Sequence, residues 1–377
     1  MTVFPEAEFE NRLARAQAAM GKAGFDALLL TSEADVRYFT GYLTRFWESP
    51  SRPWFLVIPA SGKPVAVIPA IGGALMAKTW IDDIRTWPAP TPGDDGVTLL
   101  AECLREIGTE RIAMPMGYET QLRMPLQDFH RVQDLIAPMR IDADGGLVAL
   151  LRAIKSQAEV ALIETACGIA GRAFDRVGEI AGRGTPLSDV FRNFQRLCLE
   201  EGADWVPYLA GGAGSLGYDD VISPATPRPL QSGDVLMLDT GLVHQGYFCD
   251  YDRNFVVGRP DPAVAAGYQR LREATQAGQE AARPGATAAE VYQAMQNICQ
   301  AGPGRLGHGL GMQLTEGLSL IAEDHTVLEP GMVITLEPGV DIPGGGILVH
   351  EDDFVIEENG ARQLSPTAPS NLPELPA

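Results

Sequence analysis

Apolar positions in the first 145 residues alternate between helical and strand spacing. An N-terminal helix ended by Gly24 is predicted by apolar residues three or four apart, at Phe9, Leu13, Ala16 and Met20. Further short strands and amphipathic helices are expected at 27–32, 54–60, 64–70, 72–79, 97–107 and 111–115. This alternation predicts a small α/β domain with a covered sheet over residues 1–145.

The pattern changes from Gln157 onward. Apolar residues at helical steps from Val160 to Ile180 predict one long helix, and Pro186 opens a second that runs to about Glu200. Strands are then expected at 234–241, 245–258, 331–340 and 345–358, and helices at about 262–282 and 287–300. The result is a predicted α+β domain over residues 146–364. The Pro-rich segment 365–377 is expected to be disordered or loosely attached.

Composition narrows the class of protein. The chain has 377 residues, which suggests two domains, and 45% of them are hydrophobic, as in globular proteins. Acidic residues outnumber basic ones by 49 to 29, a balance that argues against a nucleic-acid-binding surface. Because no apolar stretch has the length of a membrane span and the five cysteines lack paired spacing, we expect a soluble cytoplasmic protein with free thiols.

Candidate chemistry lies in acidic residues placed on apolar strands. These residues, together with a histidine between glycines, are Asp239, Asp250, His308, Glu337 and Glu351. Each alone has an ordinary explanation, as a turn residue, a helix cap or a solvated side chain. Together they would repel one another if buried, and a shared divalent cation removes that cost. Oxygen donors with one imidazole suit a pair of first-row metal ions.

The order of these five residues, with steps of 11, 58, 29 and 14, resembles the pita-bread metallopeptidases. That family includes prolidase, aminopeptidase P, methionine aminopeptidase and creatinase. The motifs LDTG, GHGLG and LEPG resemble its metal motifs, and segments 152–166 and 34–42 resemble the catalytic-domain entry and the creatinase-type N-terminal domain. The fold class implied is an α/β creatinase-like N-terminal domain followed by an α+β pita-bread catalytic domain.

The resemblance also implies a ligand set. Asp239 would hold one metal, His308 and Glu337 the other, and Asp250 and Glu351 would bridge them. Glu337 would also be the catalytic residue that accepts a proton from the bridging water. Two divalent ions are thus implied, with manganese expected and cobalt, zinc or iron also suited to these ligands.

Two departures from the peptidase pattern concern histidines. Peptidases of the family carry a second histidine seven residues after the ligand histidine, where this chain has Thr315. They also carry one about seventeen to twenty residues before the first aspartate, where 217–224 contains none. Tyr218, Asp219 or Asp220 could occupy that part of the pocket. Loss of such acid–base help costs about 10²–10⁴-fold in rate.

Three further residues are substrate-pocket candidates. Arg45 and Arg52 lie in the aromatic segment 42–55, and in the family a loop of this domain reaches the partner's active site in a homodimer. An arginine there could bind a substrate carboxylate through two parallel hydrogen bonds. Trp205 could form a pocket wall. An exposed loop and ordinary core packing explain these residues equally well.

The leading hypothesis is a dinuclear metal-dependent hydrolase of prolidase or aminopeptidase P type. It would cleave a small Xaa-Pro peptide or related amide with hydroxide formed at the metals, without nucleic-acid or membrane partners. A specialised non-peptidase of the same fold, a small-metabolite amide hydrolase or lyase, is the alternative because two histidines are absent. Lyase-like members place an aspartate where this chain has Gly241, which counts against that branch. A non-catalytic binding protein is the third possibility.

Overall fold

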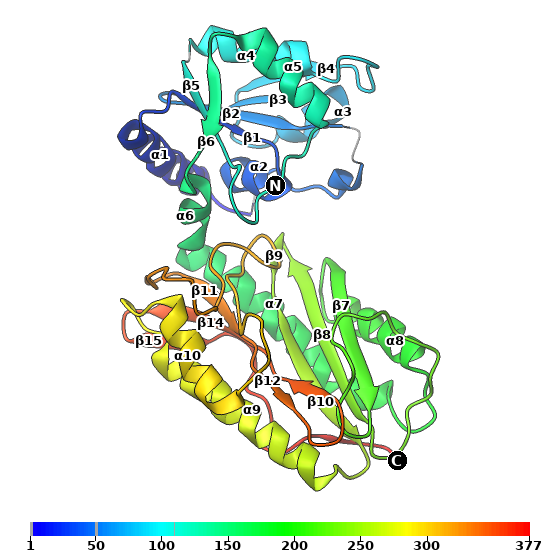
Figure 1. Cartoon of the computed structure of the whole chain (residues 1–377). Helices are drawn as coiled ribbons and strands as arrows, with labels where there is room; N and C mark the ends of the chain where they lie inside the picture. Colours follow the sequence, from blue (N-terminus) through cyan, green and yellow to red (C-terminus); the bar gives the residue numbers. More distant parts are fainter. Residues whose placement is uncertain (1–2, 50–51, 109) are drawn as a thin grey trace. The chain divides into compact units, whose positions relative to one another are not determined.

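The computed structural model describes residues 3–49, 52–108 and 110–377. The chain divides into two compact units, Met1–Arg152 and Ala153–Ala377 (Figure 1). Residues 50–51, inside the aromatic segment 42–55, lie outside the described residues. Each unit is described by itself below.

The N-terminal unit is built around a mixed six-stranded sheet in the order β4-β3-β2-β1-β5-β6. Its strands are β1 (Ala27–Leu30), β2 (Phe55–Pro59), β3 (Val65–Pro69), β4 (Asp83–Trp87), β5 (Arg111–Met114) and β6 (Arg140–Ala143). Its helices are α1 (Glu6–Ala23), α2 (Glu33–Thr40), α3 (Ala70–Met76), α4 (Val97–Ile107), α5 (Leu126–Ile136) and α6 (Leu147–Ala153), with a 3₁₀ turn η1 (Phe46–Glu48). The predicted first helix is confirmed, and Gly24 ends it with a left-handed backbone at φ 72°.

The C-terminal unit combines one mixed sheet and two antiparallel sheets with four long helices. A main sheet runs β16-β10-β8-β7 with β9 beside β8, a second runs β11-β14-β15, and β12 pairs with β13. The strands are β7 (Trp205–Gly214), β8 (Val235–His244), β9 (Tyr247–Phe248), β10 (Tyr251–Val257), β11 (Val333–Leu336), β12 (Gly339–Asp341), β13 (Ile347–Val349), β14 (Asp352–Glu357), β15 (Gly360–Gln363) and β16 (Glu374–Leu375). The helices are α7 (Gln157–Asp175), α8 (Leu187–Glu200), α9 (Pro262–Ala281) and α10 (Ala288–Cys299), with a 3₁₀ turn η2 (Val177–Glu179).

The helices of this unit cover different strands. Figure 1 shows α9 and α10 side by side, and α9 packs on β12, β13 and β15. Helices α7 and α8 contact β8 and β7, respectively. A large apolar cluster fills the space between α9, α10 and the strands, and it includes Leu271, Met295 and Ile334. The metal-motif strands are therefore held by packed helices rather than by loops alone.

Helix α7 begins as the sequence indicates but ends earlier. Its first turn is closed by a capping box in which Ser156 and Glu159 bond each other's backbone amides. The helix stops at Asp175, so the prediction that it continues to Ile180 is wrong. The chain tightens into η2, where Val177 is still buried although the helix has ended. Apolar residues at helical spacing can therefore continue beyond the end of the helix.

The predicted strands at 245–258, 331–340 and 345–358 are each interrupted. The breaks fall between β9 and β10, between β11 and β12, and between β13 and β14. Asp250, Glu337 and Glu351 each lie at one of these breaks. At Glu337 the cause is local, because Pro338 has no amide hydrogen for a strand ladder. Three of the four candidate carboxylates thus lie where a strand ends or begins.

Two expectations from composition can be compared with the structure. All five cysteines are free and buried, as predicted from their spacing. Within the described ranges, no helix combines the length and the apolarity needed to cross a membrane.

The Pro-rich C-terminal segment is ordered, so the prediction of a loose tail is wrong. Strand β16 pairs with β10, placing Leu375 beside Val257. Leu372 is 7% exposed and belongs to the apolar cluster under α9. The hydroxyl of Tyr268 on α9 donates to the carbonyl of Pro369 at 2.9 Å. Apolar residues between the prolines therefore fasten the segment, although its composition is typical of a flexible end.

Replacing Leu372 by Ala should destabilise the protein by about 2–3 kcal/mol, because it leaves a cavity in the apolar cluster. The neighbouring Asn371 is exposed, so Asn371→Ala is a matched control with little expected effect. Urea unfolding of both variants measures the difference. Equal midpoints for Leu372→Ala and the wild type would show that the segment is not packed in solution.

Candidate metal centre

Strand pairing brings the candidate carboxylates together in two pairs. In the main sheet, β8 and β10 run antiparallel, so Asp239 within β8 lies near Asp250 at the start of β10. In the second sheet, Leu336 of β11 pairs with Asp352 of β14. Glu337 follows Leu336 and Glu351 precedes Asp352, so these two residues meet at the same end of the pair. Residues far apart in sequence thereby become neighbours.

His308 reaches the centre through two glycines that allow close backbone approach. A Cβ atom on Gly307 would lie 2.2 Å from the carbonyl oxygen of Thr335, and one on Gly309 would lie 2.0 Å from that of Glu316. No side chain fits at either position. The backbone amide of His308 donates to the hydroxyl of Thr335 at 3.1 Å. The glycines of the GHGLG motif thus let the histidine segment lie directly against its neighbours.

The His308 ring is oriented to present one nitrogen to the carboxylates. Its Nδ1 lies 3.0 Å from the carbonyl oxygen of Gly309, and its Nε2 lies 3.4 Å from Oδ2 of Asp250. Burial, with a further contribution from Arg305, lowers the pKa of His308 to about 4. A proton on Nδ1 satisfies the carbonyl, so the neutral ring leaves the Nε2 lone pair available as a metal ligand.

Asp250, His308 and Glu351 form a compact donor group. Each offers a ligand atom, and these atoms lie within 4.8 Å of one another. Asp250 is 4% exposed, His308 2% and Glu351 5%, so the group is removed from solvent. Three buried donors at this separation can hold a divalent cation.

The carboxylates are in an electrostatically unfavourable arrangement. Burial and mutual repulsion raise the pKa values of Asp239, Asp250 and Glu351 well above their usual range. One buried oxygen each of Asp239 and Glu351 has no hydrogen-bond partner among the described residues. Divalent cations would neutralise the repulsion and use the unpaired oxygens. The donor set therefore fits a metal centre.

Glu337 differs from the other three carboxylates. Its side chain is 24% exposed, and Oε1 lies 3.4 Å from Nε of Arg305. Burial raises its pKa to about 7, although Arg305 opposes the rise. A carboxylate that titrates near neutral pH can take up and release a proton during a reaction. Arg305 also donates to the hydroxyl of Thr315 at 3.3 Å, which places Thr315 close to Glu337.

Several supporting residues were not among the sequence candidates for metal or catalysis. The hydroxyl of Tyr208 donates to Oδ2 of Asp239 at 2.9 Å. Oδ2 of Asp353 accepts the amide hydrogen of Asp250 at 3.0 Å. Their sequence signal is indirect, because Asp353 follows Glu351 by two positions and Tyr208 precedes a glycine-rich run. Neither carries a recognisable motif.

The Thr315 segment is fixed by a buried ion pair. Nζ of Lys155 lies 3.0 Å from Oε1 of Glu316, with side chains that are 2% and 8% exposed. Oε2 of Glu316 also accepts the amide hydrogen of Gln313 at 3.2 Å. The turn between His308 and Thr315 is thus attached to the residue that precedes α7.

Tyr218 does not present its hydroxyl to an open pocket. The side chain is 2% exposed. Its hydroxyl accepts the amide hydrogen of Val349 at 2.7 Å and donates to Oδ1 of Asn254 at 3.2 Å. These bonds join two sheets, so the structure gives Tyr218 a place in the core of the unit.

The other three pocket candidates lie away from the donor group or in the N-terminal unit. Trp205 is half-buried on β7, where it pairs with Val243 rather than with Asp239. Arg45 is exposed, and its guanidinium lies 3.5 Å from Glu48. The guanidinium of Arg52 stacks on the ring of Phe46 at 5.1 Å.

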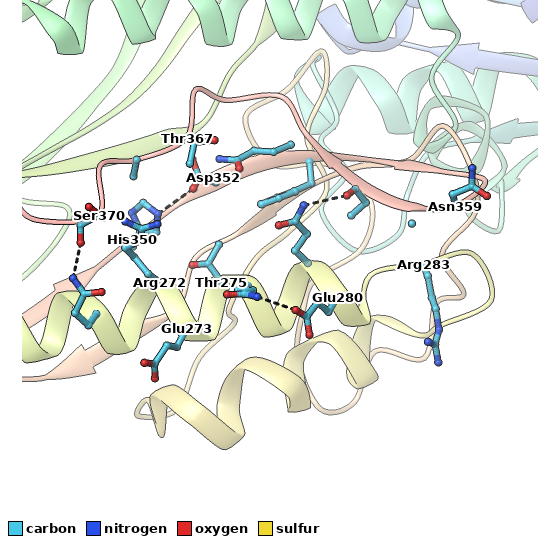
Figure 2. Close-up of a pocket in the computed structure, with 18 residues that line it drawn as sticks. Arg272, Glu273, Thr275, Glu280, Arg283, His350, Asp352, Asn359, Thr367 and Ser370 are labelled. Atoms are coloured by element: carbon cyan, nitrogen blue, oxygen red, sulfur yellow. Dashed lines mark hydrogen bonds and ion pairs between the residues drawn. The ribbon is translucent and has the colours of Figure 1, made fainter.

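A separate pocket of about 780 Å³ lies on the other face of β14 (Figure 2). Alternate residues His350, Asp352 and Phe354 line it, so Glu351 and Asp353 between them face away from it. Helix α9 and the C-terminal segment supply the rest of its wall, including Arg272 and Thr367, as Figure 2 shows. This pocket is therefore not the opening to the carboxylate group.

Comparison with known proteins agrees with this geometry. Residues 161–358 match metallopeptidase family M24, and residues 12–154 match the creatinase/prolidase N-terminal domain. The probable dipeptidase PepE of Mycobacterium tuberculosis is 29% identical over 371 residues, covering 94% of this chain and 93% of that protein. The Xaa-Pro dipeptidase of Pyrococcus horikoshii is 32% identical over 277 residues, covering 71% of this chain and 74% of that protein.

A solved structure extends the likeness to the whole fold. The dipeptidase PepE from Mycobacterium ulcerans superposes with a TM-score of 0.82 at 28% identity, covering 99% of this chain and 100% of that chain. The first matched region spans more than half of the residues, and it contains Asp239, Asp250, His308, Glu337 and Glu351. The chain therefore belongs to metallopeptidase family M24, with the pita-bread fold and a creatinase/prolidase N-terminal domain.

Proposed function

We propose that the protein is a dinuclear metal-dependent hydrolase of prolidase or aminopeptidase P type, acting on a small Xaa-Pro peptide or a related amide. The observation that carries the proposal is the buried group of Asp250, His308 and Glu351, surrounded by carboxylate oxygens without hydrogen-bond partners. Peptide hydrolysis is the chemistry of the family to which the chain belongs.

Each residue has a separate task in this proposal. Asp239 would hold one ion, His308 and Glu337 the other, and Asp250 and Glu351 would bind both. When bound, two divalent ions supply an activated water at neutral pH and polarise a carbonyl. Glu337 would accept the proton of that water at its carboxylate.

The metal preference follows from the donor atoms. Four carboxylates and one imidazole are mainly hard oxygen donors, which favours Mn²⁺, while Co²⁺, Zn²⁺ and Fe²⁺ also suit the set. The protein is proposed to be cytoplasmic and to act as a homodimer. Arg45 and Arg52 remain candidates to bind a substrate carboxylate in that assembly.

A relative's activity favours an Xaa-Pro substrate, whereas one local feature of this chain favours a different one. The Pyrococcus horikoshii relative is named an Xaa-Pro dipeptidase. Thr315 and Arg305 hydrogen-bond beside Glu337, where peptidases of the family carry a histidine. This difference favours, as second candidate, a specialised small-metabolite amide hydrolase or lyase with the same metal centre. A non-catalytic binding protein would have little need for several buried acids arranged to bind metal ions.

Replacing Glu337 by Gln should lower metal-dependent cleavage of Gly-Pro or Ala-Pro by about 10²–10⁴-fold, because the amide cannot accept a proton. The assay uses metal-stripped protein reconstituted with Mn²⁺, Co²⁺ or Zn²⁺. The exposed Glu323 gives the matched control, and Glu323→Gln should retain full activity. Metal binding by the wild type without any Xaa-Pro cleavage would contradict the peptidase assignment and favour the specialised enzyme.

Metal-free protein should become less stable relative to Glu337→Gln as pH rises. The folded-state pKa of Glu337 is raised from 4.5 to about 7, so ionisation is unfavourable in the fold between these values. The penalty is absent below about pH 4.5 and reaches on the order of 3 kcal/mol above pH 7. Chemical unfolding in EDTA at pH 5 and pH 7.5 measures it. Saturating Mn²⁺ should reverse the order, since only the wild type keeps the ligand.

A further inference from the structure

Asp252 lies on the metal-facing side of the main sheet. It pairs directly with Asp239 across β10 and β8. Opposite residues in an antiparallel pair project from the same face, so the two carboxylates lie side by side. Asp250 lies two positions earlier, just before β10 begins. Asp252 is 1% exposed, which makes it one of the most buried acids of the unit.

The carboxylate of Asp252 lacks a hydrogen-bond partner among the described residues. Both of its oxygens are buried and unpaired. Nδ1 of His350 lies 3.7 Å from Oδ1, which is an ion-pair distance although longer than a hydrogen bond. Burial lowers the pKa of His350, but Asp352 and Asp252 together raise it to about 9. Because Nε2 of the same ring lies 3.0 Å from Asp352, one positive charge is shared between two buried carboxylates.

The neighbouring acid Asp352, which faces the pocket of Figure 2, is fully paired. Asp352 lies 2.8 Å from Nη2 of Arg253 and 3.0 Å from Nε2 of His350, and it accepts the hydroxyl of Ser365 at 2.6 Å. The fold thus supplies cations and donors to the carboxylate on the pocket face. It supplies none at hydrogen-bond distance to Asp252, within the described residues.

The charge of Asp252 acts on the proposed metal ligands. It contributes to the raised pKa values of Asp239, Glu337 and Glu351. Its own pKa is raised by burial, against the lowering effects of His350 and the backbone amide of Glu351. Asp252 is therefore close enough to the centre for its charge to be felt there.

We infer that Asp252 is a fifth acidic residue of the metal centre, on the side of Asp239, and that a divalent cation supplies the positive charge that His350, shared with Asp352, leaves uncompensated. The inference rests on the dinuclear centre proposed above. Four carboxylates balance the charge of two divalent ions, and Asp252 adds a fifth negative charge. That surplus strengthens binding of the ion held by Asp239 and favours hard ions such as Mn²⁺ over softer ones.

The test is Mn²⁺ titration by calorimetry of metal-stripped wild type, Asp252→Asn and Asp352→Asn. Asp352→Asn is the matched control, a buried acid one residue from Glu351 that faces the pocket. In Asp252→Asn, the affinity for one of the two ions should fall by about 10–100-fold, while the second ion binds as before. Asp352→Asn should change neither affinity by more than about twofold.

Unfolding without metal separates a metal-facing role from a structural one. Asp252→Asn should change the stability of the metal-free protein only slightly, because it removes the repulsion from Asp239 together with the long ion pair to His350. Asp352→Asn should destabilise it, because it leaves Arg253 without its partner. The inference fails if Asp252→Asn binds both ions like the wild type. It also fails if that variant loses metal-free stability and both affinities together, as a structural residue would.

These outcomes also distinguish the two proposals. A wild type that binds no Mn²⁺ would overturn the dinuclear centre and Asp252's role with it. A wild type that binds two ions, beside an Asp252→Asn variant with unchanged affinities, would overturn only the role of Asp252.

Discussion

Repulsion between carboxylates buried near one another is the constraint on which the catalytic unit depends. Ionised carboxylates at Asp239, Asp250 and Glu351 are unfavourable in the fold, because burial and mutual repulsion raise their pKa values. The fold tolerates that cost because the surrounding elements are large and well packed, with α7, α9 and α10 buried against the strands. The arrangement makes sense as a site completed by cations rather than as a structural network.

Most of the candidate ligands lie where strands are interrupted. A residue inside a continuous strand has its direction fixed by the pleat, whereas a residue at a break can turn toward a common point. Asp250, Glu337 and Glu351 lie at such breaks, and only Asp239 lies within a strand. His308 enters by another route, between glycines that admit the backbone of Thr335 and Glu316. The strand breaks and the glycines beside His308 therefore lie where the candidate donors come together.

The sequence predicts the fold and five candidate donors because both leave local signals, and three of the five, Asp250, His308 and Glu351, lie together in one donor group. Helical spacing predicted α1, and an acid beside Pro-Gly marked the end of β11. It did not find the strand breaks or the order of segment 365–377, since these depend on contacts such as β16 with β10 and Leu372 with the apolar cluster. Arg305 was not predicted for the same reason. A hydrogen bond to a ligand from another element has no spacing rule, so only three-dimensional placement reveals it.

Strand β16 also affects how copies of this chain can associate. It covers the end of β10, where Val256 and Gly258 donate their amide hydrogens to Pro373 and Leu375. The covering strand is two residues long and flanked by Pro373 and Pro376, which lack amide hydrogens. Short edge strands and prolines discourage another chain from adding a strand there. Aggregation by sheet extension is therefore discouraged at this edge of the main sheet.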